Sequence, residues 1–474
     1  MPLIAHSQKY AESCKLSVVS HIAKTIVDQT LGTSKGAQAY HIVVTLTDAG
    51  FDAWWVGGCV RDMLLGRIPE DIDIGTNAKP IDIKALFPKC NGESATLGSM
   101  RVIREGNTYE VTTFREDDAV SDGRHPESII FSTREKDALR RDITINALYY
   151  HPISRELYDP TGGEGDLKER LIRIIGDPDT RIKHDALRLL RIIRFRALID
   201  GQYHPETYQA LHRNAKLSAI LSGSRILSEC EKILMGPHRD RALEDLWETD
   251  ILESMIPELH ACKGVAQPAD YHHEGDVWEH LLRVVRSFTN DHGIDIRIAA
   301  LFHDCGKAKT FDRKERIRFD EHASVSADLT KVVLDRFQCP AKRREKICWL
   351  VRHHMMMGAF YDPSGKQEIA EERKAHWYYH PWFTELLQLF WLDIAGTDPS
   401  NFSHYEAIEK DFHRFLDTHP RPPKPLCTGE DVMEILGIGP GARVGEILAA
   451  LYDKQIKKEI LTKEEAKKFI TSRK

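Results

Sequence analysis

The sequence predicts an α+β protein whose strands fall in the first third of the chain. Runs at 51–56, 71–74 and 99–115 have the composition and alternation of strands. Beyond about residue 181 the apolar residues recur with helical spacing. The chain has 474 residues, which favours roughly two to four domains over a single core.

Composition narrows the class of protein. The chain is 42% hydrophobic and 29% charged, as is ordinary for a soluble globular protein, and it contains no apolar run long enough to span a membrane. Its nine cysteines form no CxxC pair, so we expect free thiols and a cytoplasmic location. The net charge of −6 excludes a globally basic nucleic-acid binder but allows a local basic surface.

The first motif is a glycine turn. Residues 1–50 have a helical pattern, and 51–56 form an apolar strand that ends at Gly57-Gly58. We expect a helix from Val60 to Gly66 behind this turn. Backbone N–H groups at such a turn suit a triphosphate, although most Gly-Gly pairs are only turns.

A pair of carboxylates follows this turn. Asp71 and Asp73 lie two residues apart on a predicted strand and should project to the same face, while Ile72 and Ile74 enter a core. Like charges side by side are costly unless a cation lies between them. Mg²⁺ binds carboxylate and phosphate oxygens together. The pair therefore predicts a metal-dependent phosphoryl or nucleotidyl transfer site.

A third acid lies on a predicted hairpin. Residues 99–115 should form two strands joined at Gly106-Asn107. Glu110 interrupts the second strand. Alone it would be an edge-strand charge. Beside Asp71 and Asp73 we interpret it as the third carboxylate of the same site.

Two further segments carry polar residues at helical spacing. After a polar loop at 116–135, residues 137–150 have a helical pattern that places Asp142 and Asn146 on one face, where surface capping is the simpler explanation. Residues 181–197 should form one long helix, apolar nearly all round, that carries a row of polar residues at every third position. The row consists of Asp185, Arg188, Arg191 and Arg194. Snorkelling arginines with an internal ion pair are the simpler explanation of this row.

The order of these motifs resembles that of the class II tRNA nucleotidyltransferases, the CCA-adding enzymes, and their bacterial poly(A) polymerase relatives. The resemblance spans residues 45–235 and is carried by GGCVRDMLLGRIPEDIDIGT, YEVTTFRED, DGRHPE, RRDITINAL, DPTGGEGDL, IKHDALRLLRIIRFRA and SRILSECEKIL. It implies a polymerase-β-like head with a mixed sheet at 1–165, a helical neck at 166–262, an HD-type helical domain at 263–418 and a helical tail at 419–474.

The resemblance also implies the roles of residues. Asp71 and Asp73 would hold two Mg²⁺ ions, with Glu110 as the third catalytic carboxylate. The incoming nucleotide would be bound by Gly57, Gly58, Arg61, Arg141, Asp142, Asn146, Asp185, Arg188, Arg191 and Arg194. Asp185 and Arg188 would pair with cytosine or adenine and reject uracil or guanine, which would leave buried groups unpaired.

The implied reaction is the addition of C, C and A to tRNA from CTP and ATP, by attack of the 3′-hydroxyl on the α-phosphate with release of pyrophosphate. The loop that contains Asp122-Gly123-Arg124 would reshape the pocket between CTP and ATP. The sequence departs from the family pattern at His184 and Ser224, where the family has Glu, and this puts the local hydrogen-bond network in doubt.

The second half contains another constellation. His280, His303-Asp304 and Asp393 have apolar flanks and resemble the HD domain of metal-dependent phosphohydrolases. Imidazole and carboxylate together suit a divalent transition metal, and three further histidines were candidates to extend the site. They are His322, His353 and His354. With 23 histidines in the chain, chance clustering is the competing explanation.

Several functions stay open at this stage. Within the family, the alternatives to full CCA addition are a poly(A) polymerase and an enzyme that adds only A or only CC. A different class is an HD phosphohydrolase acting on nucleotides or cyclic phosphates. The three head carboxylates argue against a non-catalytic RNA-binding protein. The sequence predicts tRNA, CTP and ATP as partners and no membrane, and it leaves the oligomeric state open.

Overall fold

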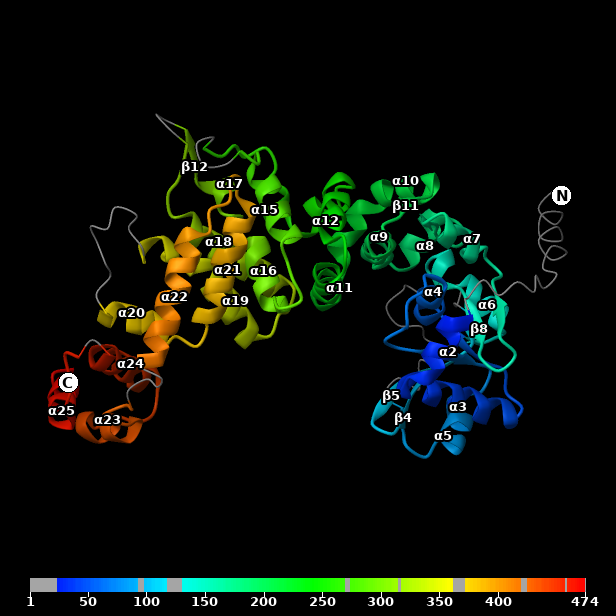
Figure 1. Cartoon of the computed structure of the whole chain (residues 1–474), viewed down its shortest axis with the longest axis horizontal. Coiled ribbons are helices and arrows are strands. Elements are labelled where there is room, and N and C mark those ends of the chain that lie inside the picture. Colours follow the sequence, from blue (N-terminus) through cyan, green and yellow to red (C-terminus); the bar gives the residue numbers. More distant parts are fainter. Residues whose placement is uncertain are drawn as a thin grey trace. The chain divides into compact units, whose positions relative to one another are not determined.

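The computed structural model describes residues 24–92, 98–116, 130–268, 273–313, 317–360, 371–418, 424–456 and 458–473. The chain forms two compact units, Met1–Met255 and Ile256–Lys474 (Figure 1). The strands of the main sheet belong to the first unit, and the second is largely helical. The α+β class predicted from the sequence is confirmed. The predicted boundaries at 165, 262 and 418 stay predictions.

A seven-stranded mixed sheet forms the centre of the first unit. Its order is β3-β4-β5-β2-β1-β8-β9, and β2 and β5 are parallel whereas the other neighbours are antiparallel. The strands are β1 (Ala53–Val56), β2 (Asp73–Thr76), β3 (Cys90–Asn91), β4 (Ser99–Arg104), β5 (Asn107–Thr113), β8 (Tyr149–His151) and β9 (Glu156–Tyr158). The predicted hairpin is confirmed, since Arg104 pairs with Asn107 at its turn.

Helices α2 (Lys24–Gly32), α3 (Ser34–Asp48), α4 (Gly58–Leu64) and α5 (Pro80–Leu86) accompany this sheet. Thr33 caps α3 by accepting a hydrogen bond from the Gly36 amide, which fixes where the helix begins. Ile42, Val43 and Leu46 of α3 are fully buried in the same core as Trp55 and Ile74. The helical pattern predicted for 1–50 is confirmed from Lys24 onward, and residues 1–23 lie outside the described part.

The single helix predicted at 137–150 is wrong. Helix α6 ends early (Arg134–Leu139), a 3₁₀ turn η2 follows (Thr144–Asn146), and the chain then enters the sheet as β8. Tyr149 and Tyr150 pair with β1 on one side and β9 on the other, and both rings are buried. Sheet pairing of two aromatic residues has overridden a local helical pattern.

The polar loop predicted at 116–135 is anchored at both of its described ends. Strand β6 (Arg115–Glu116) pairs with β7 (Ile130–Phe131). The Lys136 ammonium lies 2.7 Å from the Glu116 carboxylate and reinforces this pairing. Asp122-Gly123-Arg124 and the rest of 117–129 lie outside the described residues.

The rest of the first unit is mainly helical. Its elements are α7 (Gly163–Lys168), β10 (Leu171–Ile172), α8 (Pro178–His184), α9 (Arg188–Ile199), β11 (Gln202–Tyr203), α10 (Pro205–Asn214), η3 (Ala215–Ile220), α11 (Gly223–Met235), α12 (Arg239–Glu248) and α13 (Ile251–Met255). The single helix predicted for 181–197 is wrong, because the chain breaks at Asp185, whose backbone is extended (φ −146°, ψ 99°). Asp177 caps α8 and Pro178 occupies its first turn, so α8 is a short helix of its own.

The second unit is an assembly of helices with one small hairpin. Its elements are α14 (Pro257–His260), α15 (Val277–Arg286), α16 (Ile294–Phe302), α17 (Lys307–Thr310), β12 (Phe311–Arg313), β13 (Ile317–Phe319), α18 (His322–Arg336), α19 (Ala341–His353), η4 (His354–Ala359), α20 (Glu371–Tyr378), α21 (Phe383–Gly396) and α22 (Ser403–Thr418). Within the described residues, no helix combines the length and the apolar character that a membrane crossing requires.

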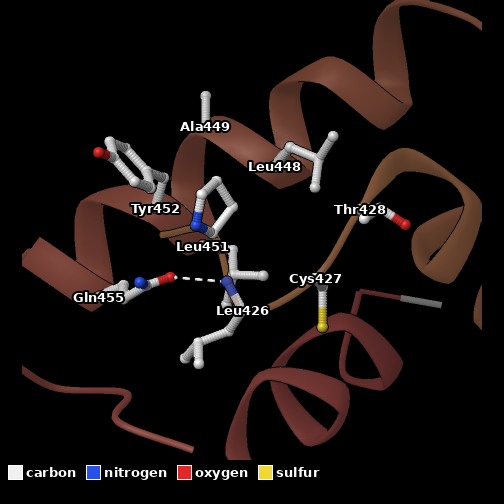
Figure 2. A pocket seen from close by; sticks show the side chains of 9 residues that line it. Leu426, Cys427, Thr428, Leu448, Ala449, Leu451, Tyr452 and Gln455 are labelled. Carbon is white, nitrogen blue, oxygen red and sulfur yellow. Dashed lines mark hydrogen bonds between the residues drawn. The ribbon is translucent and has the colours of Figure 1, made fainter. Parts of the chain in front are cut away.

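Three helices form a small core of their own near the C-terminus (Figure 1). They are α23 (Gly429–Leu436), α24 (Ala442–Ile456) and α25 (Lys463–Thr471). Gly437 ends α23 in the left-handed conformation (φ 66°), which glycine adopts without strain. An apolar cavity of about 420 Å³ lies where Leu426 meets α24, and the Leu426 amide donates to Gln455 Oε1 at 3.0 Å (Figure 2).

Candidate functional site

The glycine turn connects β1 to α4 at the edge of a polar cluster. Gly57 has φ 74°, a conformation that L side chains rarely adopt. A Cβ atom at Gly57 would lie 3.0 Å from the Arg141 guanidinium. Glycine therefore both permits the turn and lets Arg141 approach the backbone.

The head carboxylates lie beside this turn. Strand β2 begins at Asp73, which pairs with Val56 at the end of β1, and the parallel neighbour β5 carries Glu110. Asp71 precedes the strand rather than belonging to it, and its side chain is 88% exposed and 3.1 Å from Lys35 Nζ. Ile72 and Ile74 are buried as predicted.

Asp73 is electrostatically perturbed. Burial, and then the neighbouring Glu110 carboxylate, raise the pKa of Asp73 to about 6, Asp71 raises it further and Arg141 opposes the shift. The Ser99 hydroxyl donates to Glu110 Oε1 at 2.7 Å. In the described part of the chain, the sets of three donor atoms within 4.8 Å of one another lie elsewhere, so these carboxylates form an open group rather than a closed cage.

A chain of hydrogen bonds leads from the glycine turn to the arginine row. Arg61 is buried and donates from Nη1 to Asn146 Oδ1 at 2.7 Å. Asn146 in turn donates to Asp142 Oδ1 at 3.3 Å. Asp142 Oδ2 accepts two bonds from Arg191, at 2.9 Å from Nε and 2.6 Å from Nη2. Burial opposes ionisation of Asp142, but the Arg191 guanidinium outweighs it and lowers the pKa of this carboxyl.

Arg141 is held by two buried groups that the sequence analysis missed. Its Nε donates to the Tyr149 hydroxyl at 3.0 Å and to Asp137 Oδ2 at 3.3 Å, and its Nη1 donates to the Asn146 carbonyl at 3.2 Å. The Tyr149 hydroxyl also donates to Asp137 at 2.7 Å. Asp137 lies four residues before Arg141, a spacing that could have identified the pair.

The predicted arginine row is divided between two segments. Asp185 lies in the break before α9 and accepts from Arg225 Nη2 at 3.1 and 3.3 Å. Arg188 opens α9 and donates to the Arg181 carbonyl. Asp185 and Arg188 thus contact different neighbours, Arg225 in the first case and backbone carbonyls in the second.

Helix α11 supports the other end of the row as well. Glu229 is buried and accepts from Arg194 Nε at 2.8 Å and from Lys232 Nζ at 2.7 Å. The Phe195 ring lies among three guanidinium groups, at 4.2 Å from Arg194, 5.4 Å from Arg191 and 5.5 Å from Arg61. The two departures from the family pattern, His184 and Ser224, are both exposed.

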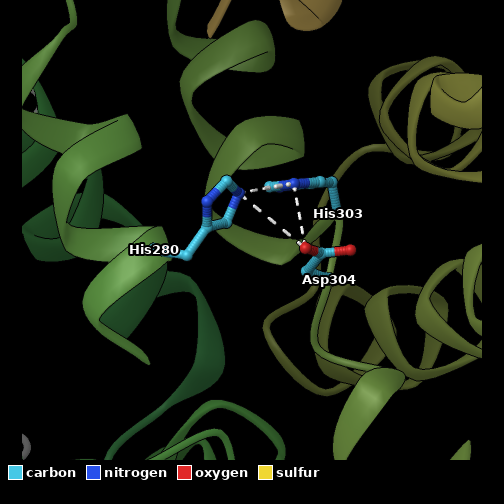
Figure 3. Close-up of side chains that lie close together, drawn as sticks. All are labelled: His280, His303 and Asp304. Atoms are coloured by element: carbon cyan, nitrogen blue, oxygen red, sulfur yellow. Dashed lines mark hydrogen bonds and ion pairs between the residues drawn. The ribbon is translucent and has the colours of Figure 1, made fainter. Parts of the chain in front are cut away.

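A second cluster lies inside the C-terminal unit. His280 of α15, His303 after α16 and the adjacent Asp304 converge, with the two imidazole Nε2 atoms 3.4 Å apart (Figure 3). Asp393 of α21 completes the group, its Oδ1 at 3.2 Å from His280 Nε2 and 3.4 Å from His303 Nε2. The structure therefore brings together the four residues predicted from the sequence.

Two of the three additional histidines join this cluster. His322 and His354 lie with their Nε2 atoms 3.3 Å apart and 3.3 and 3.7 Å from Asp304 Oδ1. Asp304 Oδ2 faces His280 and His303 instead, so one carboxylate serves both groups. His353 points away and packs against Trp349, so it is not part of the site.

The hydrogen bonds of these imidazoles define which nitrogen is free. Nδ1 of His303, His322 and His354 lies 2.7–2.9 Å from the backbone carbonyls of Ala300, Phe319 and Val351. Because a carbonyl only accepts, Nδ1 carries the proton and the Nε2 lone pair faces the cluster. This donor set fits one or two divalent transition-metal ions.

Two glycines allow the helices to approach closely at this cluster. A Cβ atom at Gly396 of α21 would lie 2.4 Å from Val284 Cγ2 and 3.1 Å from His280 Cε1. A Cβ atom at Gly306 would lie 2.5 Å from the His322 carbonyl. The segments around the cluster therefore pack too closely to leave room for a side chain at either glycine.

The pKa values of residues in the cluster are strongly shifted from their ordinary values. Burial would raise the pKa of Asp304, but Lys307, whose Nζ lies 2.7 Å from Asp304 Oδ2, outweighs it and with His303 holds this pKa well below its usual range. Burial lowers the pKa of His354 to about 4, so this ring is neutral and able to bind a metal at neutral pH. Lys307 is buried and was missed in the sequence analysis.

Comparison with protein families identifies three segments of the chain. Residues 53–173 match the poly(A) polymerase head domain, 202–263 match a probable RNA- and SrmB-binding site of polymerase A, and 271–375 match the HD domain. The head and the RNA-binding segment are thus similar to those of the class II CCA-adding enzymes and poly(A) polymerases, and an HD domain follows them. Both resemblances stated from the sequence are confirmed.

CCA-adding enzymes are among the curated proteins similar to this chain. That of Geobacillus stearothermophilus is 41% identical over 223 residues, which cover 47% of this chain and 55% of the relative. That of Lactobacillus helveticus is 37% identical over 231 residues, 48% of this chain and 57% of the relative. The chain thus spans about half the length of the curated relatives it matches.

Solved structures extend the likeness over the chain. The crystal structure of the Bacillus stearothermophilus CCA-adding enzyme in complex with CTP is 26% identical, with a TM-score of 0.63, over 93% of this chain and 98% of that one. The Thermotoga maritima CCA-adding enzyme complexed with tRNA has the same fold at 18% identity, with a TM-score of 0.52, over 95% of this chain and 98% of that one.

Proposed function

We propose that this protein adds C, C and A to the 3′ end of tRNA from CTP and ATP without a nucleic-acid template. The observation that carries the proposal is the hydrogen-bond path from Arg61 through Asn146 and Asp142 to Arg191. It connects the arginine beside the glycine turn with the row proposed to select the base. The CCA-adding relatives support the proposal.

Asp71 and Asp73 would hold Mg²⁺, with Glu110 beside them. The carboxylate oxygens fit this ion, and the raised pKa of Asp73 is typical of acids placed together for a cation. Bound Mg²⁺ would lower the pKa of the tRNA 3′-hydroxyl and stabilise charge on the leaving pyrophosphate. Arg61 and Arg141, each fixed by buried acceptors, would bind the triphosphate in line with that hydroxyl.

Asp185 and Arg188 would select the base. Asp185 Oδ1 accepts from Arg225 and from the Leu187 amide, whereas Oδ2, which accepts from Arg225 at 3.3 Å, retains a lone pair that could accept from the amino group of cytosine or adenine. Arg188 donates to the backbone carbonyls of Arg181 and Arg140, which hold its guanidinium in place, and it would donate to a ring nitrogen or carbonyl of the base. Uracil presents a carbonyl to Asp185 in place of the amino group and would be rejected.

The test is incorporation on tRNA that lacks its 3′ end, with each labelled nucleotide and sequencing of the products. Stepwise addition of C, C and A is expected. Asp71→Ala should abolish it, whereas Asp48→Ala, an exposed aspartate at the end of α3, is the matched control and should leave it unchanged. Tails of A alone on varied RNAs would favour a poly(A) polymerase, and products ending in CC or receiving only A would favour a partial enzyme.

A second function is favoured by the buried His and Asp cluster of the C-terminal unit. We propose that it hydrolyses phosphate esters or cyclic phosphates of nucleotides. His280, His303, Asp304 and Asp393 would hold a divalent transition metal. The metal, when bound, would activate a water molecule. The buried Lys307 would contact the phosphate from beside Asp304.

Phosphate release from 2′,3′-cyclic nucleotides tests this second proposal. Asp304→Ala should abolish release and leave CCA addition intact, and Asp328→Ala, an exposed aspartate of α18, is the control. Release that persists in Asp304→Ala would contradict the assignment. A cytoplasmic location is part of the proposal and is supported by the eight cysteines of the described residues, all of which are free thiols.

A further inference from the structure

Glu274 lies behind the metal-binding face of His280. Its Oε1 is 3.3 Å from His280 Nδ1, and both side chains are fully buried. His280 Nε2, on the opposite side of the ring, faces Asp393 and His303. The imidazole therefore lies between a carboxylate on one side and the cluster on the other (Figure 3 shows the cluster side).

This arrangement differs from that of the other three imidazoles. His303, His322 and His354 each place Nδ1 against a backbone carbonyl, whereas His280 places it against an anionic side chain. A carboxylate is a stronger acceptor than a carbonyl and makes the opposite nitrogen a better electron donor. Burying a carboxylate is costly unless it has partners, so its position behind this one ring requires a compensating interaction.

Glu274 also has a contact that anchors its own position. Its Oε2 accepts from the Asp398 amide at 2.9 Å, and the His273 amide donates to the Asp398 carbonyl at 2.9 Å. Asp398 follows α21 by two residues, and α21 carries Asp393. The carboxylate is thereby fixed relative to two segments that supply ligands.

We propose that Glu274 is a positioning residue of the metal centre. Through the charge of its carboxylate, 3.3 Å away, it favours the proton on Nδ1 of His280, holds the ring in the tautomer that presents the Nε2 lone pair, and raises the metal affinity of the site. The proposal rests on the proposed metal-binding function of the HD cluster. It assigns to Glu274 a role in the site without contact between Glu274 and the metal.

Titration of the metal-stripped full-length protein with Mn²⁺ tests the proposal, in a parent protein that carries Asp71→Ala and Asp73→Ala so that the proposed metal site of the head does not contribute. Glu274→Gln keeps the shape of the side chain and an oxygen for the Asp398 amide, but it loses the charge. We expect about tenfold weaker Mn²⁺ binding, in the range typical for loss of such a carboxylate. With Co²⁺ as the probe, the visible absorption of the bound ion should also shift, because the donor strength of His280 changes.

Arg283→Met is the matched control. It removes the ion pair between Arg283 and Asp398, 3.2 Å, and so loosens the same segment without touching His280. The proposal predicts unchanged Mn²⁺ affinity and Co²⁺ absorption for this variant. Equal losses in both variants would show that Glu274 only ties segments together, and an unchanged affinity in Glu274→Gln would overturn the proposal. If the parent protein, with its HD cluster intact and its head site removed, binds neither ion, the metal centre itself is wrong and the proposal is wrong with it.

Discussion

The ion pair between Asp142 and Arg191 offers a quantitative test of the head site. Asp142→Asn keeps the acceptor for the Ile143 amide, which Asp142 Oδ1 now binds at 2.9 Å, but it replaces the oxygen that faces Arg191 with an N–H donor. Breaking a buried ion pair from one side costs about 3–5 kcal/mol. Because the Arg191 side chain is 34% exposed, water will solvate the freed guanidinium in part, so we expect about 2 kcal/mol.

A double-mutant cycle measures this interaction in the full-length protein. Asp142→Asn and Arg191→Met should each lower the free energy of unfolding in urea, and the double variant should cost little more than either, which corresponds to a coupling of about 1.5 kcal/mol or more. Both single variants should also raise KM for CTP and ATP, because Asn146 and Arg61 lose their anchor. Additive losses of stability would refute the reasoning, since they would mean that the two side chains act independently.

Four further outcomes are expected. Burial and an acidic neighbour raise the pKa of Asp73 to about 6, so protons compete with the metal below that pH. The Mn²⁺ affinity of the head should therefore be constant from pH 7 to 8 and fall about tenfold per pH unit below pH 6. A constant affinity down to pH 5 would contradict this. The folded metal-free protein binds a proton at Asp73 more tightly than the unfolded chain does, so protonation of Asp73 stabilises the fold. This stabilisation is complete below pH 3.8 and is lost as the pH rises through 6. Gly396→Ala should cost about 1–3 kcal/mol of stability and weaken Mn²⁺ binding in the HD cluster, because its Cβ has no room, whereas Gly293→Ala, with open space around it, should change neither. Arg225→Met should remove the contact that holds the Asp185 carboxylate in position, and so increase incorporation of UTP relative to CTP without a loss of stability above about 1 kcal/mol. Unchanged selectivity would argue against a role for this contact.

The carboxylates of the head were predictable because strand geometry is local. Ile72 and Ile74 mark the buried side of the segment, and the turn at Glu105-Gly106, one residue before the predicted position, fixes the register that places Glu110 on the strand beside Asp73. The order of elements and the class of fold follow from the same patterns. What the alternation could not predict is that Asp71 lies before the strand and is paired with Lys35, since that contact comes from a distant helix.

The break at Asp185 was not predicted, because the residues after it are apolar on every side and give no sign of where a helix begins. Asp177-Pro178 was an available signal for a separate short helix. For His353 and His354 the sequence could not predict which of the two faces the cluster, for a different reason. Consecutive residues on a helix point about 100° apart, so only one of the two can face the cluster, and which one depends on the packing of α19. Contacts such as Glu274 with His280 join separate segments and have no sequence periodicity.

The position of β1 in the sheet has a consequence for synthesis of the chain. β1 lies between β2 and β8, so one of its edges stays unpaired until the ribosome has made Tyr149–His151. Until then the apolar strand Ala53–Val56 presents free backbone groups that could pair with another chain. The acidic site on β2 therefore matures late, well after its own residues have emerged. A nascent chain arrested before Tyr149 should be prone to aggregate, and it would need chaperone protection that the finished head does not.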